Sequence, residues 1–384
     1  MKFYVDCVGC EQRQLDAQRI INYLNENGHE QSSSPSAADY TVLVTCAVNR
    51  SAERASLKRV SELSGEASKP ENLIISGCLP DISPDQLGAY GTFPVVSPKR
   101  LENFDVLLEP YVTVPMSDIA YPNSSIFDTR QDPIGLLNEL SPRDEYDLAK
   151  NGYKIRVNNG CLMDCSYCVI KDAMGRVVSV PFDELVRQFE AAAVRKEPTI
   201  MFMGGDTGAY GYDLDSVVRF YTLLERTLGV QGDHRVFVHD FNANWYLRNA
   251  DDYDAIFANN ENRGRLRGVM IPVQSGSDKI LKLMKRPYKA KDVSERLGRI
   301  KREYPSLHLG THIITGFPSE TQEDFDLTLN LLDRVGFDFM SVFVYSEHKR
   351  AKSSPLEEKI DPEIAKNRAL HIADRFGELA KVFE

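Results

Sequence analysis

Three cysteines, Cys161, Cys165 and Cys168, stand in the spacing CxxxCxxC. The apolar segment KIRV and the turn residues Asn-Asn-Gly precede them, which predicts a loop at the end of a β-strand. Three thiolates can hold three irons of a [4Fe–4S] cluster and leave the fourth iron open. An open iron can chelate a ligand that carries both an amine and a carboxylate. Tyr167, beside the last cysteine, is expected to pack against such a ligand.

Two other interpretations of this triplet are a zinc site and a chance group of buried thiols. Zinc usually takes four ligands, often in two paired groups, and no fourth Cys or His lies nearby in the sequence. Seven cysteines in a large chain without a signal peptide indicate metal or redox chemistry rather than structural disulfides. The triplet therefore favours an iron–sulfur site.

Four more cysteines lie in the first hundred residues, and each follows an apolar strand. Cys7 and Cys10 follow KFYVD, Cys46 follows YTVLV, and Cys78 follows NLIIS. Because the carboxyl ends of parallel strands share one edge, these thiols are expected to lie together and to hold a second cluster. A thioredoxin-like pair of Cys7 and Cys10 is the alternative, but it leaves the other two cysteines unexplained.

Alternating strands and helices must position these residues. Strands are predicted at 2–6, 40–44, 72–76 and 92–96, with helices at 14–25, 52–63 and 84–89. This alternation is typical of βαβ units and predicts an α/β fold with an N-terminal Rossmann-like parallel sheet over 1–111. Residues 112–153 have no sustained period and many Pro, Asn, Ser and Asp, so we interpret them as a linker.

A second α/β run covers 154–384. Its predicted strands are 154–157, 199–203, 235–239, 268–272, 308–315 and 339–345, with helices such as 182–195 and 214–228. Six strands in this length indicate an incomplete (β/α)6 barrel of the TIM type. The segment ALHIADRFGELAKVF near the end is predicted to be one amphipathic helix.

Polar residues and glycines that follow the barrel strands are candidates for the active end. Glycines allow a ligand to approach the backbone closely. The alternative for 204–206 is a tight turn with a helix-capping Asp, and Asp240 and Asn242 could equally be surface caps. The candidate cofactor-binding residues, besides Tyr167, are Gly204, Gly205, Asp206, Asn242, Gln274 and Ser275.

The charge of the chain bears on its partners. A formal net charge of −10 argues against nucleic-acid binding over the whole surface. Ten basic residues nevertheless lie between Lys279 and Arg302, against four acids from Asp278 to Glu303. They form either a solvated helix face or a groove for RNA or a peptide. The chain has neither an apolar run of about 18 residues nor a signal peptide, so we expect no membrane partner and a cytoplasmic location.

Three further segments resemble those of the radical SAM (S-adenosylmethionine) methylthiotransferases, and the resemblance extends to about residue 350. They are MGGDTGAYG (203–211), PVQSGSDKILKLMKRPY (272–288) and HIITGFPSETQEDFDLTL (312–329). Members of this family insert sulfur into an unactivated C–H bond and deliver it as a methylthio group. Their substrates are tRNA adenosines or an aspartate of a ribosomal protein.

The resemblance implies two [4Fe–4S] clusters. The CxxxCxxC cluster would bind SAM and reduce it to a 5′-deoxyadenosyl radical. VGCEQRQLDAQ, VTCAVNRSAERA and SGCLPD are similar to the N-terminal cysteine segments of the family, and their cluster would carry the sulfur. An electron donor of the flavodoxin or ferredoxin type is the implied partner. We predict catalytic roles for Cys10, Cys46, Cys78 and Gln274.

The sequence departs from the family pattern at three places. Cys7 has no counterpart, and it is either spare or a fourth ligand of the N-terminal cluster. Met174 and Val180 stand where the family carries arginines. The family normally ends in a small basic β-barrel, the TRAM domain, whereas about forty residues follow Tyr345. With the acidic charge, these departures favour a peptide or small-molecule substrate, while tRNA stays possible.

Two other functions compete with methylthio transfer. In one, the N-terminal cluster only relays electrons, with Cys7 as its fourth ligand. In the other, the chain is a non-enzymatic protein that binds an iron–sulfur cluster or zinc. Formation of a methylthio product would separate the first from the leading hypothesis, and cleavage of SAM would exclude the second.

Overall fold

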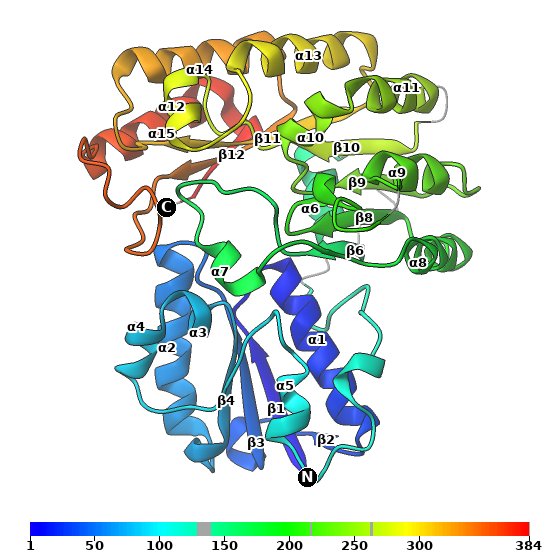
Figure 1. Ribbon diagram of the computed structural model, residues 1–384, viewed down its shortest axis with the longest axis vertical. Helices are drawn as coiled ribbons and strands as arrows, with labels where there is room; N and C mark the ends of the chain where they lie inside the picture. Colours follow the sequence, from blue (N-terminus) through cyan, green and yellow to red (C-terminus); the bar gives the residue numbers. More distant parts are fainter. Residues whose placement is uncertain (129–139, 216, 262–263, 384) are drawn as a thin grey trace. The chain divides into compact units, whose positions relative to one another are not determined.

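The computed structural model describes residues 1–128, 140–215, 217–261 and 264–383, and it divides the chain into two compact units (Figure 1). The described part of the first unit contains 1–128 together with Cys168–Arg176. The second contains 140–167 and the described residues from 177 onward. Each unit is built around one sheet. No helix in the described residues is long and apolar enough to span a bilayer.

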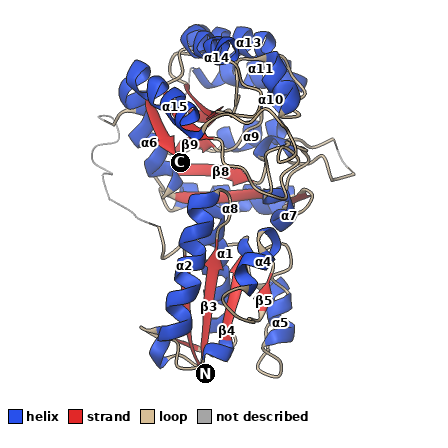
Figure 2. Cartoon of the chain, turned by 90° about the vertical axis from the view of Figure 1, so that its left-hand side faces the viewer, coloured by secondary structure: helices blue, strands red, loops and turns tan. Residues whose placement is uncertain are grey.

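The first unit has a five-stranded sheet of order β2-β1-β3-β4-β5, in which all neighbours are parallel. Helices α1 and α2 lie on opposite faces of it, as Figures 1 and 2 show. All but the first residue of the β3 segment YTVLVT are buried, as expected of a strand covered on both faces. The predicted Rossmann-like sheet is confirmed. The strands are β1 (Lys2–Cys7), β2 (Glu30–Gln31), β3 (Tyr40–Thr45), β4 (Leu73–Gly77) and β5 (Val95–Val96).

The helices of the first unit are α1 (Glu11–Glu26), α2 (Arg50–Glu66), α3 (Leu79–Ile82), α4 (Pro84–Gly88), α5 (Asn103–Leu107) and α7 (Ile170–Met174). The three helices predicted for the first unit correspond to α1, α2 and α4, and α7 comes from the later segment Cys168–Arg176.

The second unit is an open barrel of order β13-β12-β11-β10-β9-β8-β6-β7. All neighbours are parallel except β6 and β7, which pair antiparallel at the edge. The predicted incomplete barrel is confirmed. Its strands are β6 (Tyr153–Asn159), β7 (Val178–Ser179), β8 (Thr199–Gly204), β9 (Arg235–Val238), β10 (Leu266–Met270), β11 (His308–Thr315), β12 (Phe339–Val344) and β13 (Ala380–Phe383).

Side chains of the barrel strands alternate between two apolar layers. One layer packs against the helices that follow the strands, and the other faces a single helix, α6 (Pro142–Lys150). The following helices are α8 (Phe182–Val194), α9 (Phe220–Leu228), α10 (Ala243–Arg248), α11 (Ala250–Glu261), α12 (Asp278–Leu283), α13 (Ala290–Glu303), α14 (Gln322–Val335) and α15 (Pro362–Phe376).

Helix α6 fills the inside of the open barrel. Tyr146 and Ala149 pack against one side chain from each of four strands, namely Met201, Phe237, Met270 and Phe339. Glu145 is fully buried and pairs with Arg235 and Arg267, at the beginnings of β9 and β10. The helix therefore ties together strands that are far apart in the sequence.

The segment predicted as a linker, 112–153, contains parts that pack with each unit. Arg19 of α1 donates to the carbonyls of Met116 and Ile119, so 112–128 belongs with the first unit. Helix α6 belongs with the barrel. Residues 129–139 lie outside the described part of the chain.

Two predicted helices have other bounds than expected. The C-terminal helix was predicted to continue to Phe383, but α15 ends before Gly377, whose φ of 58° suits a helix end. The next residues form β13, where Phe383 stacks on Phe343 of β12. Helix α9 begins at Phe220 rather than at 214, and Arg219 is its N-cap.

Candidate active site

The loop with the CxxxCxxC cysteines begins where β6 ends. Gly160 has a φ of 75°, which turns the chain out of the strand. Cys161 and Cys165 are partly buried. Ser166 donates from its backbone N to the Met284 carbonyl (3.1 Å) and from its Oγ to the Leu283 carbonyl (2.7 Å). These bonds fix the loop to the end of α12. Cys168 begins the segment that belongs with the first unit.

Gly204 and Gly205 let the end of β8 lie against this loop. A Cβ on Gly204 would be 2.2 Å from Asn158 Oδ1, and a Cβ on Gly205 would be 2.2 Å from the carbonyl oxygen of Gly160. No side chain fits at either distance. In the structure these glycines lie close to the backbone that leads into the cysteine loop, and the predicted approach of a ligand stays a prediction.

Asp206 is the buried carboxylate of this strand end, with 3% of its surface exposed. Its Oδ2 accepts from Trp245 Nε1 (2.6 Å) and from Cys161 Sγ (3.8 Å). Its Oδ1 has no hydrogen-bond partner among the described residues, and the side chain caps no helix. Burial raises the pKa of Asp206 to about 6. The capping alternative is therefore wrong for this residue.

Gln274 lies in the left-handed region, with φ of 70°. Its backbone bridges to β11, donating to the His312 carbonyl and accepting from Ile314 N. Its Oε1 is buried without a partner in the described residues. A strained backbone and a spare acceptor at a strand end are typical of a binding site. Gln274 therefore stays a candidate ligand-binding residue.

The side chains of Ser275 and Asn242 already have hydrogen-bond partners within the protein. Ser275 Oγ lies 3.3 Å from Thr328 Oγ1 of α14. Asn242 Oδ1 accepts from Asn244 N (3.0 Å) and so caps α10. The capping alternative is the one that the structure favours for Asn242. Its backbone N bonds Asp206, so it also helps to position that carboxylate.

Arg286 is a candidate that was not singled out from the sequence. It is 8% exposed, and its Nη2 donates to Tyr167 Oη (2.8 Å). Its Nε has no partner among the described residues, and its charge interacts with Cys165 and Asp206. The only sequence signal was its place in KRPY, where it was counted with the exposed basic residues.

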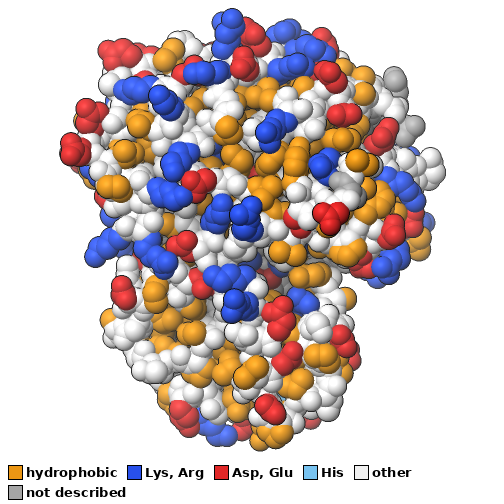
Figure 3. Space-filling view, in the orientation of Figure 1, with side chains coloured by type: hydrophobic (Ala, Val, Ile, Leu, Met, Phe, Trp, Pro, Cys, Tyr) orange, Lys and Arg blue, Asp and Glu red, His pale blue; other side chains and the backbone are white. Residues whose placement is uncertain are grey.

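The other basic residues between Lys279 and Arg302 behave as a solvated face. Seven of them form ion pairs with acidic side chains of the same unit, including Lys291 with Glu295. Lys and Arg mix with Asp and Glu on the face seen in Figure 3. This arrangement gives no continuous basic groove. The other pairs are Lys279–Asp324, Lys285–Asp164, Lys289–Asp278, Arg296–Asp254, Arg299–Asp254 and Lys301–Asp338.

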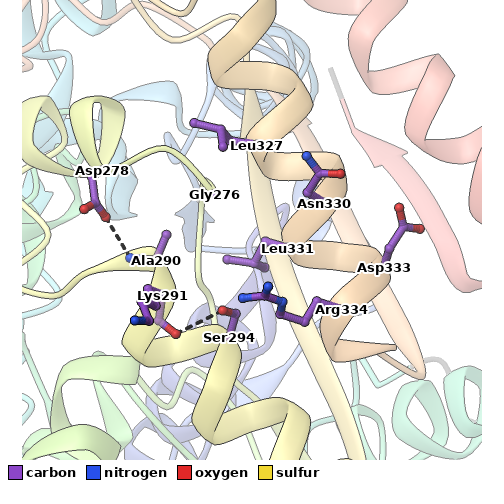
Figure 4. Close-up of a pocket in the computed structure, with 10 residues that line it drawn as sticks. All are labelled: Gly276, Asp278, Ala290, Lys291, Ser294, Leu327, Asn330, Leu331, Asp333 and Arg334. Atoms are coloured by element: carbon purple, nitrogen blue, oxygen red, sulfur yellow. Dashed lines mark hydrogen bonds between the residues drawn. The ribbon is translucent and has the colours of Figure 1, made fainter.

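An open hollow of about 860 Å³ lies between α13 and α14 (Figure 4). Figure 4 shows side chains of mixed character around it, including Lys291, Leu327, Asn330 and Arg334. None of its lining residues is a cysteine or a predicted site residue. The hollow therefore adds no chemistry to the strand-end site.

The N-terminal cysteines lie at the strand ends of the first sheet. The order of this sheet reverses between β1 and β3, which is where ligands bind in open α/β sheets. Cys10 begins α1 after β1. Cys46 after β3 exchanges hydrogen bonds with Ser56 Oγ of α2. Cys78 after β4 donates from its N to the Thr45 carbonyl (3.0 Å).

These three thiols interact with one another. A hydrogen bond between the thiols of Cys10 and Cys46 lowers the pKa of Cys46, and burial raises the pKa of Cys78 to about 11. The positive charge of Arg13 lowers the pKa of all three thiols. In the described residues no three His, Cys, Asp or Glu side chains are arranged tightly enough to hold a metal ion. The donor set of three thiols on neighbouring strand ends nevertheless suits an iron–sulfur cluster.

Cys7 differs from the other three N-terminal cysteines. It is partly buried and packs against the apolar core of the first unit. Its Sγ accepts from Gly9 N (3.4 Å), and burial raises the pKa of its thiol to about 12. The neighbouring Cys10 thiol raises the pKa of Cys7 further.

The donors and acceptors of the barrel site suit S-adenosylmethionine. Asp206 Oδ1 and Gln274 Oε1 are spare buried acceptors, which an ammonium group would satisfy. Arg286 Nε is a spare buried donor, which a carboxylate would satisfy. The partly buried thiols of Cys161 and Cys165 lie in the same unit.

Family models match most of the two units. The model of the radical SAM superfamily matches residues 155–332. The model described as uncharacterized protein family UPF0004 matches residues 2–94. The first model covers β6 to α14 of the barrel, and the second covers the first sheet as far as the beginning of β5.

Curated relatives match nearly the whole chain. The tRNA-2-methylthio-N(6)-dimethylallyladenosine synthase of Caldicellulosiruptor saccharolyticus is 27% identical over 98% of this chain and 78% of its own length. The ribosomal protein uS12 methylthiotransferase RimO of Thermosipho melanesiensis is 28% identical over 97% of this chain and 82% of its own.

Solved structures share the fold at low identity. The radical SAM methyltransferase TsrM of Kitasatospora setae has a TM-score of 0.59 at 14% identity, over 89% of this chain and 72% of that one. The cobalamin-dependent radical SAM enzyme OxsB has a TM-score of 0.58 at 11% identity, over 98% and 61%. The chain therefore combines a radical SAM domain with a UPF0004 domain, and over nearly its whole length it is similar to methylthiotransferases of tRNA and of ribosomal protein uS12.

Proposed function

We propose that this protein transfers a methylthio group to an adenosine of tRNA, with two [4Fe–4S] clusters and SAM as cofactors. The observation that carries the proposal is the second group of thiols, Cys10, Cys46 and Cys78, at the switch edge of the first sheet. Reductive cleavage of SAM needs only the CxxxCxxC cluster. Three additional interacting thiols are expected where sulfur itself must be held.

Each group of barrel residues has a distinct proposed task. Cys161, Cys165 and Cys168 would hold the cluster that binds SAM. When bound, the cluster and SAM supply a carbon radical that can abstract a hydrogen atom from the substrate. Asp206 and Gln274 would accept hydrogen bonds from the SAM ammonium group, because each has a spare buried oxygen.

Arg286 and Tyr167 would also help to orient SAM. The 2.8 Å hydrogen bond from Arg286 Nη2 to Tyr167 Oη holds the tyrosine ring beside the cysteine loop. The buried guanidinium keeps one donor, Nε, for the SAM carboxylate. Neither residue needs to change protonation state for this role.

The N-terminal thiols would hold the cluster that carries sulfur. Cys7 is proposed to stay outside this cluster, because it packs against the apolar core of the first unit and its Sγ already accepts from Gly9 N. Three ligands leave one iron for a sulfur atom. If Cys7 were a fourth ligand, the cluster could only relay electrons, which is the competing hypothesis.

The relatives bear on the choice of substrate. One acts on a tRNA adenosine and another on ribosomal protein uS12, and they give no support to the peptide or small-molecule substrate that the charge suggested. Ribosomal protein uS12 is the second candidate. The net charge of −10 and the ion-paired basic face favour a cationic protein over a polyanion.

The test supplies both substrates to the same preparation. Anaerobically reconstituted protein receives SAM, sulfide and dithionite with either uS12 or bulk tRNA that lacks the methylthio group. Mass spectrometry then records a gain of SCH₃ minus H on the substrate. We expect the gain on tRNA adenosine. A gain on uS12 alone would replace the first candidate with the second.

Two variants locate the chemistry. Cys161→Ala should abolish both 5′-deoxyadenosine and the methylthio product. Cys46→Ala should keep 5′-deoxyadenosine and lose the product. The parent protein could make 5′-deoxyadenosine but modify neither tRNA nor uS12. That result would exclude methylthio transfer to these two substrates, and the electron-relay hypothesis would become the better one.

A further inference from the structure

Arg13 is a buried arginine at the strand edge that carries the N-terminal thiols. It lies in the first turn of α1, three residues after Cys10, and only 2% of its surface is exposed. A Cβ on Gly9 would be 2.2 Å from Arg13 Cβ. A larger residue at position 9 would clash with the Arg13 side chain, so Gly9 makes room for the arginine.

The guanidinium of Arg13 is incompletely satisfied. Its Nη1 lies 2.9 Å from Asp16 Oδ2, and both side chains are 2% exposed. The angles of this contact are not those of a hydrogen bond, and Nη1 has no hydrogen-bond partner among the described residues. Burying a charge costs free energy unless partners compensate it. A donor left over at this position indicates a partner that binds later.

Arg13 lies about one helical turn after Cys10, at the sheet edge where the strands that lead to Cys46 and Cys78 also end. Its charge acts on Cys10, Cys46 and Cys78, and each of these thiols acts on Arg13 in return. Arg59, another cation of this unit, has three carboxylate partners, including Asp6, whereas one ion pair is recorded for Arg13. Arg13 is therefore a buried cation placed next to the thiol group.

We propose that Arg13 is a positioning residue that supplies the counter-charge for an anionic iron–sulfur cluster on Cys10, Cys46 and Cys78. The inference rests on the proposed function only in assuming that this cluster forms. Three thiolates leave the assembly anionic, and a sulfide on its open iron would make it more so. A buried positive charge favours the reduced state of a cluster, and hydrogen bonds to its sulfurs do the same. Asp16 would hold the guanidinium in place.

The test isolates the N-terminal cluster in the full-length chain. The parent for this experiment carries Ala in place of Cys161, Cys165 and Cys168, so that one cluster remains. Arg13→Gln removes the charge, and Arg13→Lys keeps it without the planar fork. Arg54→Gln is the matched control, because Arg54 is an exposed cation on α2 of the same unit.

Three quantities are measured after anaerobic reconstitution: iron and sulfide per chain, the midpoint potential from a redox titration followed by EPR, and the rate of iron release to a chelator. Arg13→Gln should shift the midpoint to a more negative potential and release iron about tenfold faster, as expected for a lost charged interaction. Arg13→Lys should keep a midpoint near that of the parent. Arg54→Gln should change neither quantity.

The contrary results are distinct. Equal potentials and release rates in the parent and Arg13→Gln would overturn the inference, and so would an Arg13→Lys protein that behaves like Arg13→Gln. If Arg13→Gln does not fold by circular dichroism, Arg13→Lys decides the question. A parent without iron would exclude the second cluster and this inference together. A parent that holds its cluster, combined with a native enzyme that makes no methylthio product, would exclude the proposed function alone.

Discussion

Gly205→Ala should separate folding from catalysis at the barrel site. The new Cβ would lie 2.2 Å from the Gly160 carbonyl oxygen, whereas ordinary contacts begin at 3.4 Å. The loop that begins with Cys161 must therefore move by about 1 Å, which as overpacking costs about 1–3 kcal/mol of stability. A displacement of about 1 Å at reacting groups can cost about 10²-fold in rate. We expect a folded protein that forms 5′-deoxyadenosine about 100-fold more slowly.

The assay is formation of 5′-deoxyadenosine by reconstituted protein with SAM and dithionite, together with iron content and thermal unfolding. Gly298→Ala is the matched control, because the nearest atoms to its new Cβ on α13 are at 3.4 Å. That variant should cleave SAM at the parental rate. Parental activity in Gly205→Ala would refute the reasoning, since it would show that the loop position does not limit the reaction.

Three further predictions concern single side chains. Cys7→Ala should keep the iron content of the parent, whereas Cys46→Ala should lose about four irons per chain; equal losses in the two variants would make Cys7 a ligand. Glu145→Gln should lower the free energy of unfolding by about 3 kcal/mol in urea, because Arg267 loses a buried partner; an unchanged midpoint would contradict this. Burial lowers the pKa of His312 from 6.5 to about 4, so the folded state excludes a proton that the unfolded state binds. Stability should therefore fall as the pH drops from about 6.5 to 4, and this loss should be smaller in His312→Gln; parallel urea profiles of the two proteins across that range would oppose it.

Much of the fold could be predicted because buried parallel strands are short apolar runs. The prediction of β11, His308–Thr315, agrees with the structure residue for residue. The predicted C-terminal helix extends too far, because no residue of AKVF excludes a helix. These residues form a strand because they pair with β12. Local sequence does not contain that long-range partner.

The site was predictable where spacing alone determines chemistry, as for the cysteines. The roles of charged residues were less predictable, because they depend on whether each side chain is buried. Arg286 and Lys285 are neighbours in one basic segment, yet Arg286 is buried against Tyr167 and Lys285 pairs with Asp164 at the surface. Arg13 was missed for the same reason. A charged residue reveals its role only when tertiary packing shows what surrounds it.

Helix α6 has a consequence for the order in which the chain matures. Arg143 of α6 donates to the Met340 carbonyl, 197 residues later, and Tyr146 needs Phe339 of β12. At a synthesis rate of about 5–20 residues per second, the helix waits roughly 10–40 seconds for these partners. The strands of the first sheet, by contrast, have all been made by residue 96. The N-terminal sheet can thus pair its strands on the ribosome while the barrel core is still exposed to chaperones.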